Sequence, residues 1–223
     1  MALRGKRIVI TGGAGVLGQG VARVAKQQGA DVVLLDVIQP QAGAVGEFVA
    51  VDLTDTNSLV ACFDRIGDFD VLANIAGGFA MGPSVYETED ELWDAMFTIN
   101  VTTLRRVLNV AVPRLLARGR GSVVNVGALG ALKGGPNMGA YLASKSVVMR
   151  LTESLSEEVK HAGVNVNAVL PTVIDTPRNR ADMPAVDPAL WVNPEDLGSV
   201  ICFLGSDAAQ AVHGALVPVN GLS

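Results

Sequence analysis

The chain has 223 residues, of which 49% are hydrophobic and 17% are charged, and its net charge is −5. This length and composition exclude a disordered chain and favour one large domain covering residues 1–223. The negative charge comes with no basic cluster, which excludes an electrostatic surface for nucleic acid or an anionic membrane. Charges interrupt every apolar stretch before about 20 residues, the length of a membrane span, and no signal-peptide pattern precedes the first apolar run. We therefore expect a soluble cytoplasmic protein.

Seven strand-like apolar runs occur along the chain, at 8–10, 32–35, 48–51, 71–73, 122–126, 164–170 and 215–219. Helical patterns alternate with them, through Val21 to Ala25 and over about 89–97, 101–117, 141–161 and 194–204. Continuous apolar strands separated by helices predict an α/β fold with a parallel sheet covered on both faces. The irregular segment 172–193, rich in Pro, Asp and Arg, is predicted to be a loop that closes over a ligand.

The cysteines and histidines carry no metal or disulfide pattern. Cys62 and Cys202 lie far apart in helical-looking apolar segments, which favours reduced core thiols. His161 and His213 have no carboxylate or cysteine companions at metal-ligand spacing. We expect no metal site.

A glycine-rich turn, Thr11 to Gly18, joins the first strand to the first helix. Such a turn brings backbone N–H groups and a positive helix end close to a pyrophosphate, where side chains would obstruct it. The cofactor-binding candidates in the turn are Gly12, Gly15, Val16, Leu17 and Gly18. The alternative is a turn that is merely tight.

Asp36 ends the second strand, 18 residues beyond Gly18. A carboxylate there can accept hydrogen bonds from adenosine ribose hydroxyls and would repel a 2′-phosphate. Residues 31–46 contain no Lys or Arg that could bind that phosphate. This pattern favours NAD(H) over NADP(H), and the alternative is a solvated strand-end carboxylate.

Tyr141 and Lys145 are four residues apart in a helical segment, so their side chains share one helix face. A free tyrosine has a pKa of about 10, and a neighbouring cation lowers that pKa by favouring the phenolate. The pair is therefore a candidate for proton transfer. Two exposed helix residues are the alternative interpretation.

Further segments complete a family pattern: Asp52-Leu53, the strand end Asn74-Ile75-Ala76-Gly77, Asn100, and Pro171 with Ile174 and Thr176. Together with the glycine turn and the Tyr141–Lys145 pair, they make the whole chain resemble the short-chain dehydrogenase/reductase family. The resemblance implies a single Rossmann-type domain, a doubly wound parallel sheet of about seven strands with helices on both faces.

The resemblance also implies roles for individual residues. It makes Tyr141 the proton donor, Lys145 the group that lowers the pKa of Tyr141 and holds the nicotinamide ribose, and Asn100 the anchor of a water chain. Cofactor contacts are implied for Asp52, Leu53, Asn74, Ala76, Gly77, Tyr141, Lys145, Pro171, Ile174 and Thr176, with NADH as the cofactor.

Two departures from the family pattern stand out. The middle glycine of the turn lies one position early, at Gly15, and Val16 takes its usual place. The family generally has a serine 13 residues before the tyrosine, where this chain has Ala128. That serine donates a hydrogen bond to the substrate carbonyl, and losing one such donor can cost a few kcal/mol of transition-state stabilisation.

Quinonoid dihydropteridine reductases, one branch of the family, tolerate this loss. This chain resembles them in the compact glycine turn, in Ala76-Gly77-Gly78, in residues 127–138, and in the run Asp175 to Arg180 followed by Met183-Pro184. In contrast, Asn74 and Asn100 follow the broader family, and Phe79 stands where those reductases have tryptophan.

The resemblance implies an NAD(H)-dependent oxidoreductase that transfers hydride to a carbonyl or quinonoid, dihydropteridine-like small molecule. An ordinary ketone or alcohol dehydrogenase is the alternative enzyme. A nucleotide-binding sensor with weak catalysis is the alternative of another class, favoured by the missing hydroxyl at position 128. Candidate substrate contacts are Ala128, Phe79, Met138, Met183 and Trp191. The family usually forms homodimers or homotetramers through the helices that begin near Asn100 and Tyr141, and we expect this of the chain.

Overall fold

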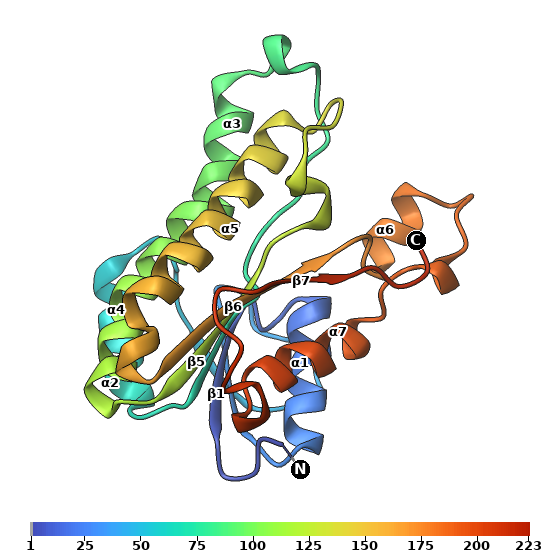
Figure 1. Cartoon of the computed structure of the whole chain (residues 1–223). Helices are drawn as coiled ribbons and strands as arrows, with labels where there is room; N and C mark the ends of the chain where they lie inside the picture. Colours follow the sequence, from blue (N-terminus) through green and yellow to red (C-terminus); the bar gives the residue numbers. More distant parts are fainter. Residues whose placement is uncertain (1) are drawn as a thin grey trace.

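The computed structural model describes residues 2–223, so the predicted domain begins one residue before the described part. Seven parallel strands form one sheet in the order β3-β2-β1-β4-β5-β6-β7, which confirms the predicted fold class (Figure 1). The strands are β1 (Arg7–Thr11), β2 (Asp31–Asp36), β3 (Glu47–Ala50), β4 (Val71–Asn74), β5 (Gly121–Val126), β6 (Val164–Pro171) and β7 (Leu216–Val219).

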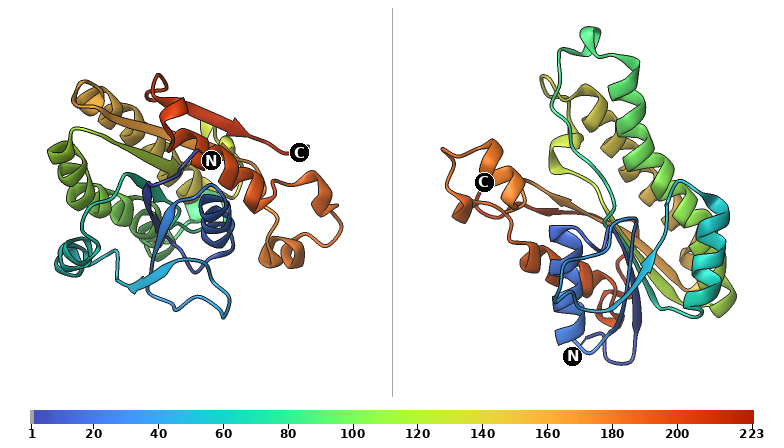
Figure 2. Two further views of the ribbon diagram at one scale, coloured as in Figure 1. Left: turned by 90° about the horizontal axis from the view of Figure 1, so that it is seen from below. Right: turned by 180° about the vertical axis from the view of Figure 1, so that it is seen from behind.

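Helices cover both faces of the sheet (Figure 2). They are α1 (Val16–Gln27), α2 (Thr56–Ile66), α3 (Asp90–Phe97), α4 (Thr103–Arg118), α5 (Gly139–Val159), α6 (Pro177–Asp182) and α7 (Pro194–Leu204). Helices α1 and α7 pack together on one face, and α2, α4 and α5 cover the other. Helix α3 continues into α4 and, with the start of α5, extends beyond the sheet (Figure 1).

The central strands read as continuous apolar runs because both of their faces are buried. Val9 and Leu72 point into the core under α2, α4 and α5, whereas Ile8 and Ile10 point into the core under α1 and α7. Each of these four side chains is fully buried. Alternate side chains of β1 therefore pack against the helical layers on opposite faces of the sheet.

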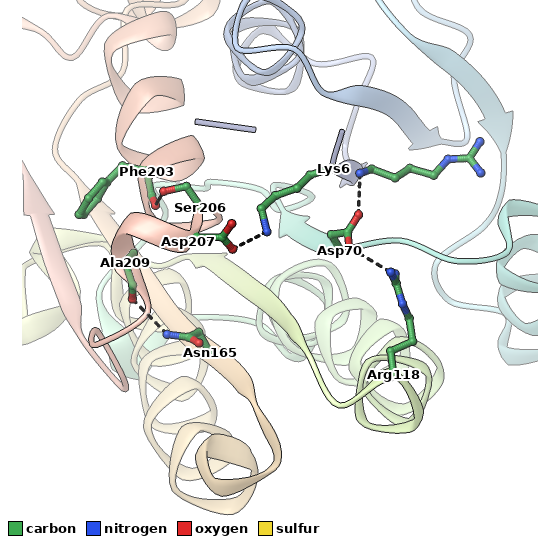
Figure 3. Close-up of polar contacts among 9 residues, drawn as sticks. Lys6, Asp70, Arg118, Asn165, Phe203, Ser206, Asp207 and Ala209 are labelled. Atoms are coloured by element: carbon green, nitrogen blue, oxygen red, sulfur yellow. Dashed lines mark hydrogen bonds and ion pairs between the residues drawn. The ribbon is translucent and has the colours of Figure 1, made fainter. Parts of the chain in front are cut away.

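Polar contacts fasten the amino-terminal edge of the sheet, opposite the glycine turn (Figure 3). Asp70, just before β4, accepts a hydrogen bond from the Arg7 backbone N–H at 2.9 Å and forms an ion pair with Arg118 at 3.0 Å. Lys6 pairs with Asp207 at 2.7 Å, and the Asn165 amide donates to the Ala209 carbonyl at 3.1 Å. These contacts join β1, β4 and β6 to the elements at this edge, whereas the glycine turn follows β1 at the opposite, carboxyl edge.

The structure differs from the predicted elements at two places. Segment 172–193 is not wholly irregular, because α6 and a 3₁₀ turn, Pro188–Leu190, lie within it. Thr176 accepts a hydrogen bond from the Asn179 backbone N–H and Pro177 follows, the start signal of a helix. The helix predicted over 101–117 begins within a π-helical turn, Thr98–Thr102, instead of as a regular α-helix.

Among residues 2–223, no helix is long and apolar enough to span a membrane. Cys62 and Cys202 are buried free thiols, as predicted. The same residues contain no group of three or more His, Cys, Asp or Glu side chains placed to hold a metal ion.

Candidate active site

The carboxyl ends of β1 and β4 form the point where the strand order reverses. In open α/β sheets this switch point leaves a crevice in which ligands bind. The glycine turn follows β1, Asp36 ends β2, and Asn74 ends β4, so all three lie along this edge. Tyr141 and Lys145 reach it from the first turns of α5.

The glycine turn is closed by its own backbone. Gly15 N–H donates to the Gly12 carbonyl at 3.1 Å, and Gly12 has a φ of +67°, which favours glycine. A Cβ on Gly18 would collide with the Gly12 carbonyl oxygen, so the turn and α1 can meet only without a side chain there. Helix α1 begins at Val16 with no side-chain cap, so its first N–H groups, including that of Leu17, are free of intrahelical partners and suit an anion.

Asp36 faces the glycine turn. Its carboxylate accepts hydrogen bonds from the Ala14 N–H at 3.0 Å and from the Ile38 N–H at 3.2 Å. These bonds hold the carboxylate beside the turn, where a ribose hydroxyl could also reach it. Asp52 and Leu53 follow β3; the Asp52 carboxylate is held by Thr54, which lowers its pKa, and Leu53 is buried.

A buried polar chain supports the ends of β4 and β5. The Asn74 side-chain amide donates to the Asn125 carbonyl oxygen at 2.9 Å, and Asn125 donates to Thr152 at 2.9 Å. Thr11 accepts hydrogen bonds from the backbone N–H groups of Ile75 and Ala76 at 3.1 and 3.2 Å. Three of these groups, Thr11, Asn125 and Thr152, were not among the predicted site residues, because only the pairing of distant strands and the packing of α5 against them bring these groups together.

Asn100 lies in the π-helical turn and connects β4 to α5. Its side-chain oxygen accepts from the Gly78 N–H at 2.9 Å, and its amide donates to the Gly78 carbonyl at 3.1 Å and to Ser144 Oγ at 3.0 Å. A Cβ on Gly77 would lie 2.8 Å from the Asn100 side-chain oxygen and 3.1 Å from Lys145 Nζ. The close approach therefore requires glycine at position 77. The predicted water chain at Asn100 stays a prediction.

Lys145 is 6% exposed, and its ammonium donates to the Val126 carbonyl at 2.9 Å. A small cavity lies beside it, and its polar lining includes Asn74, Asn100 and Asn125. The side-chain oxygen of Asn74, buried here, has no hydrogen-bond partner among the described residues. A polar cavity of this kind suits an ordered water.

Burial shifts the pKa values of Tyr141 and Lys145. It lowers the pKa of Lys145 to about 8 and raises the pKa of Tyr141 to about 12. The expected lowering of the Tyr141 pKa by Lys145 is therefore wrong for this arrangement, because burial of the phenol raises that pKa. At neutral pH Tyr141 is a protonated phenol, the form that can donate a proton.

The five predicted substrate residues divide into two groups. Ala128 and Met138 pack in a small cluster with Tyr141, and the Phe79 ring meets the Tyr141 ring edge to face at 4.9 Å. Met183 follows α6 and Trp191 is buried at the end of segment 172–193, and neither lines a described cavity beside Tyr141.

Segment 172–193, which contains α6, is fastened at both ends by residues 219–223. At one end, Thr172 Oγ1 donates to the Asn220 carbonyl at 2.7 Å and lies 3.0 Å from Ser223 Oγ. At the other end, Leu222 N–H donates to the Leu190 carbonyl at 2.9 Å. Pro171, at the end of β6, precedes this stem, Ile174 bridges to Val192 within it, and Thr176 caps α6.

Replacing Thr172 by Val should loosen this stem. The variant loses the hydroxyl bond to Asn220 but keeps the shape of the side chain, so we expect tryptic cleavage after Arg178 or Arg180 to accelerate about fivefold, the effect of one lost hydrogen bond. Mass spectrometry of timed digests measures the rate. Thr172→Ser retains the hydroxyl and is the control; equal cleavage of all three proteins would contradict the role of the bond.

Lys145 should make stability depend on pH. Because its pKa falls from 10.5 to about 8 on folding, Lys145 binds more protons in the unfolded chain between these values, and its contribution to the free energy of unfolding should rise with pH there. Lys145→Met should lack this rise. Urea unfolding at several pH values from 8 to 10 measures it. Lys160→Met, at the far end of α5, is the control and should keep the rise; the same pH dependence in Lys145→Met would contradict the burial of the charge.

Fold and site together define a dinucleotide-binding α/β protein, and comparisons with known proteins specify its family. A family model described as enoyl-(acyl carrier protein) reductase matches residues 12–221. The chain is 32% identical to 2-(S)-hydroxypropyl-CoM dehydrogenase 3 of Xanthobacter autotrophicus, covering 98% of this chain and 96% of the relative. It is 33% identical to cis-4-hydroxycyclohexanecarboxylate dehydrogenase of Sinomonas cyclohexanicum, covering 96% and 94%.

Among solved structures, one from Beutenbergia cavernae, described as a candidate NAD(P)-dependent gluconate 5-dehydrogenase with NADP bound at low occupancy, superposes with a TM-score of 0.89. It is 29% identical over 99% of this chain and 97% of that one. The chain belongs to the short-chain dehydrogenase/reductase family of NAD(P)-dependent oxidoreductases. The expected likeness to quinonoid dihydropteridine reductases is not supported, because both named relatives are dehydrogenases of hydroxyl compounds.

Proposed function

We propose that this protein is an NAD(H)-dependent dehydrogenase that interconverts a secondary alcohol and its ketone. One observation carries the proposal: the Tyr141 phenol, protonated at neutral pH, lies one helical turn from the buried Lys145 ammonium at the switch point of the sheet. The two relatives named above support it, since each is a dehydrogenase whose named substrate carries a hydroxyl group.

The residues at the switch point fit a nicotinamide dinucleotide. The free N–H groups at the start of α1 suit the pyrophosphate. Gly18 has no side chain, so the glycine turn can pack closely against this end of the helix. Asp36 would hold the adenosine ribose, and Asp52 with Leu53 would border the adenine. The nicotinamide end would lie near Asn74, Ala76, Gly77, Pro171, Ile174 and Thr176. A bound nicotinamide supplies or accepts the hydride.

The protein's own residues would handle the proton. In ketone reduction Tyr141 donates its phenolic proton to the carbonyl oxygen, and in alcohol oxidation the tyrosinate accepts it. Lys145, fixed by the Val126 carbonyl, stabilises that tyrosinate and has further N–H groups for the nicotinamide ribose. Asn100 and Ser144 hold the first turns of α5 in place, which positions both side chains.

We propose a preference for NADH because Asp36 borders the adenosine ribose site without a nearby cation. Asp36→Ser removes the carboxylate that would repel a 2′-phosphate, so the ratio of kcat/KM for NADH to that for NADPH should fall at least about tenfold. Steady-state kinetics with both cofactors measure the ratio. Asp31→Ser, at the opposite end of β2, is the matched control; an unchanged ratio in Asp36→Ser would rule out this basis for the preference.

The experiment that tests the function is a cofactor-oxidation assay with secondary alcohols, ketones and quinonoid pterins. Reversible turnover of an alcohol–ketone pair is expected. Turnover confined to quinonoid pterins would favour the dihydropteridine-like function, for which the missing hydroxyl at Ala128 is the supporting observation. Tight NADH binding with no turnover of any compound would favour a sensor.

We also propose that the protein is a homodimer or homotetramer assembled through α4 and α5. An aromatic pair next to these helices supports it: Trp93, which is 37% exposed, stacks on Phe97 at 5.2 Å on α3, which continues into α4. Light scattering after size exclusion measures the assembly, and a monomer at micromolar concentration would contradict it.

A further inference from the structure

A second hollow, which shares no lining residue with the Lys145 cavity, is lined in part by Tyr141. It is a small hollow, open to solvent, between the loop after β4, helix α3 and the start of α5, which Figure 1 shows side by side. Its lining includes Pro83, Leu92, Met96, Met138 and Tyr141. We call it the Tyr141 hollow.

The wall of this hollow is fixed by the backbone. Gly82 N–H donates to the Asn137 carbonyl at 2.8 Å, which ties the loop after β4 to the residues before α5. Asn137 holds a φ of +61°, a left-handed conformation that is uncommon for a residue other than glycine. The Thr88 hydroxyl, also in the lining, donates to the Ser84 carbonyl at 3.1 Å. Backbone hydrogen bonds and a fixed backbone conformation therefore hold the wall of the hollow in place.

Among residues 2–223, no charged side chain lines the Tyr141 hollow. A carboxylate entering it would lose its hydration and gain no cationic partner, whereas an alkyl group would gain by leaving water. The two arginines of α6 are already paired, Arg178 with Asp182 and Arg180 with Asp175. Lys133 lies in the segment before α5, exposed and outside the lining.

The surroundings of the hollow are acidic. Residues 66–104, which include the loop after β4 and α3, contain no Lys, Arg or His. Five exposed carboxylates lie around the start of α3, and none forms a salt bridge among the described residues: Glu87, Glu89, Asp90, Glu91 and Asp94. Their field disfavours the approach of an anion, and salt screens that part of the effect.

We propose that the Tyr141 hollow receives the non-reacting part of the substrate and selects for a neutral, apolar group there, in contrast to the carboxylate named in the Sinomonas relative's substrate. This inference rests on the proposed function, because it takes Tyr141 as the group that meets the reacting oxygen. The substrate class is thus a neutral secondary alcohol or ketone with an alkyl or alicyclic body.

The test compares three cyclohexanols that differ only at C4: the methyl compound, the carboxamide and the carboxylate. We expect kcat/KM to fall in that order, with the carboxamide at least about tenfold better than the carboxylate, because the two have similar shapes and differ in charge. Added salt should narrow this difference only in part. Equal or better turnover of the carboxylate would overturn the proposal.

Two variants place a cation in the hollow. Thr88→Lys and Leu92→Lys should each lower the ratio of kcat/KM for the carboxamide to that for the carboxylate about tenfold. Thr88 is partly exposed and tolerates the change, so Thr88→Lys still tests the proposal if Leu92→Lys fails to fold. Ala95→Lys adds the same charge to an exposed site on α3 outside the lining and should change the ratio little. An equal effect of Ala95→Lys and Thr88→Lys would show that the hollow does not set the preference.

Calorimetry distinguishes a failure of the proposed function from a failure of this inference. If none of the three alcohols is turned over, their binding to the NAD⁺-loaded protein still measures the preference of the hollow. Tighter binding of the methyl compound than of the carboxylate would uphold the inference without the activity. Tighter binding of the carboxylate, equal binding, or no binding of any of the three would overturn it.

Discussion

Tyr141→Phe should lower kcat for alcohol oxidation and ketone reduction by about a thousandfold, which lies within the range that general acid–base groups contribute. The loss should be this large because Phe79, Ala128 and Met138, which pack beside Tyr141, carry no group that could donate a proton, and Ala128 stands where the family has its serine. The ring should keep its edge-to-face contact with Phe79 in the variant, so the thermal unfolding temperature should change little.

Steady-state rates together with NADH binding measure this prediction. Binding should be retained, since Lys145 and Asn100 keep their own hydrogen bonds to Val126 and Gly78. Tyr86→Phe changes the chain's other tyrosine, which is 86% exposed, and is the matched control. A Tyr141→Phe protein with more than about a tenth of the wild-type rate would remove Tyr141 from the chemistry, given the contribution expected of such a group.

Ala128→Ser should raise ketone reduction, by about tenfold to a hundredfold in kcat, because it restores a donor for the developing negative charge on the carbonyl oxygen. Ala128 follows β5 in extended backbone and packs beside Tyr141. The neighbouring position is less suited, since a Cβ on Gly127 would lie 2.5 Å from the end of the Leu170 side chain, which would have to shift. Position 128 is therefore where a hydroxyl group could be added to this segment.

The same assay with a quinonoid acceptor gives the comparison for this variant. Quinonoid reduction builds less localised charge on oxygen, so its rate should stay unchanged. Ala131→Ser, another buried alanine in the same cluster, controls for packing. If ketone turnover fails to rise in Ala128→Ser, the substrate carbonyl does not lie against residue 128.

The local features of the chain could be predicted from its sequence. The strands are short runs of Val, Ile and Leu, and the glycine turn lies between a strand and a helix, so both leave a pattern within a few residues. The predicted order of alternating elements therefore matches the observed sheet. Even the start of α6 has a local signal, Thr176 followed by Pro177. It was missed because the Pro, Asp and Arg content of segment 172–193 indicated a loop.

The features that depend on distant contacts could not be predicted in this way. Asn125 and Ser144 joined the site only when the strand pairing set Asn125 beside Asn74, and when the π-helical turn aimed Asn100 at α5. The pKa of Tyr141 was wrongly predicted for a similar reason. Helix spacing places Lys145 near it, but burial, a property of the whole fold, decides the direction of the shift.

The central claim is that hydride passes between a nicotinamide and a carbinol carbon while Tyr141 handles the proton. Its most direct test is reduction of an alicyclic ketone with NADH deuterated at the transferable C4 position, with the product analysed by mass spectrometry. We predict an alcohol carrying deuterium on the carbinol carbon, formed by the wild-type protein and nearly lost in Tyr141→Phe. Absence of deuterated alcohol from the wild-type reaction, while NADH remains tightly bound, would contradict the account.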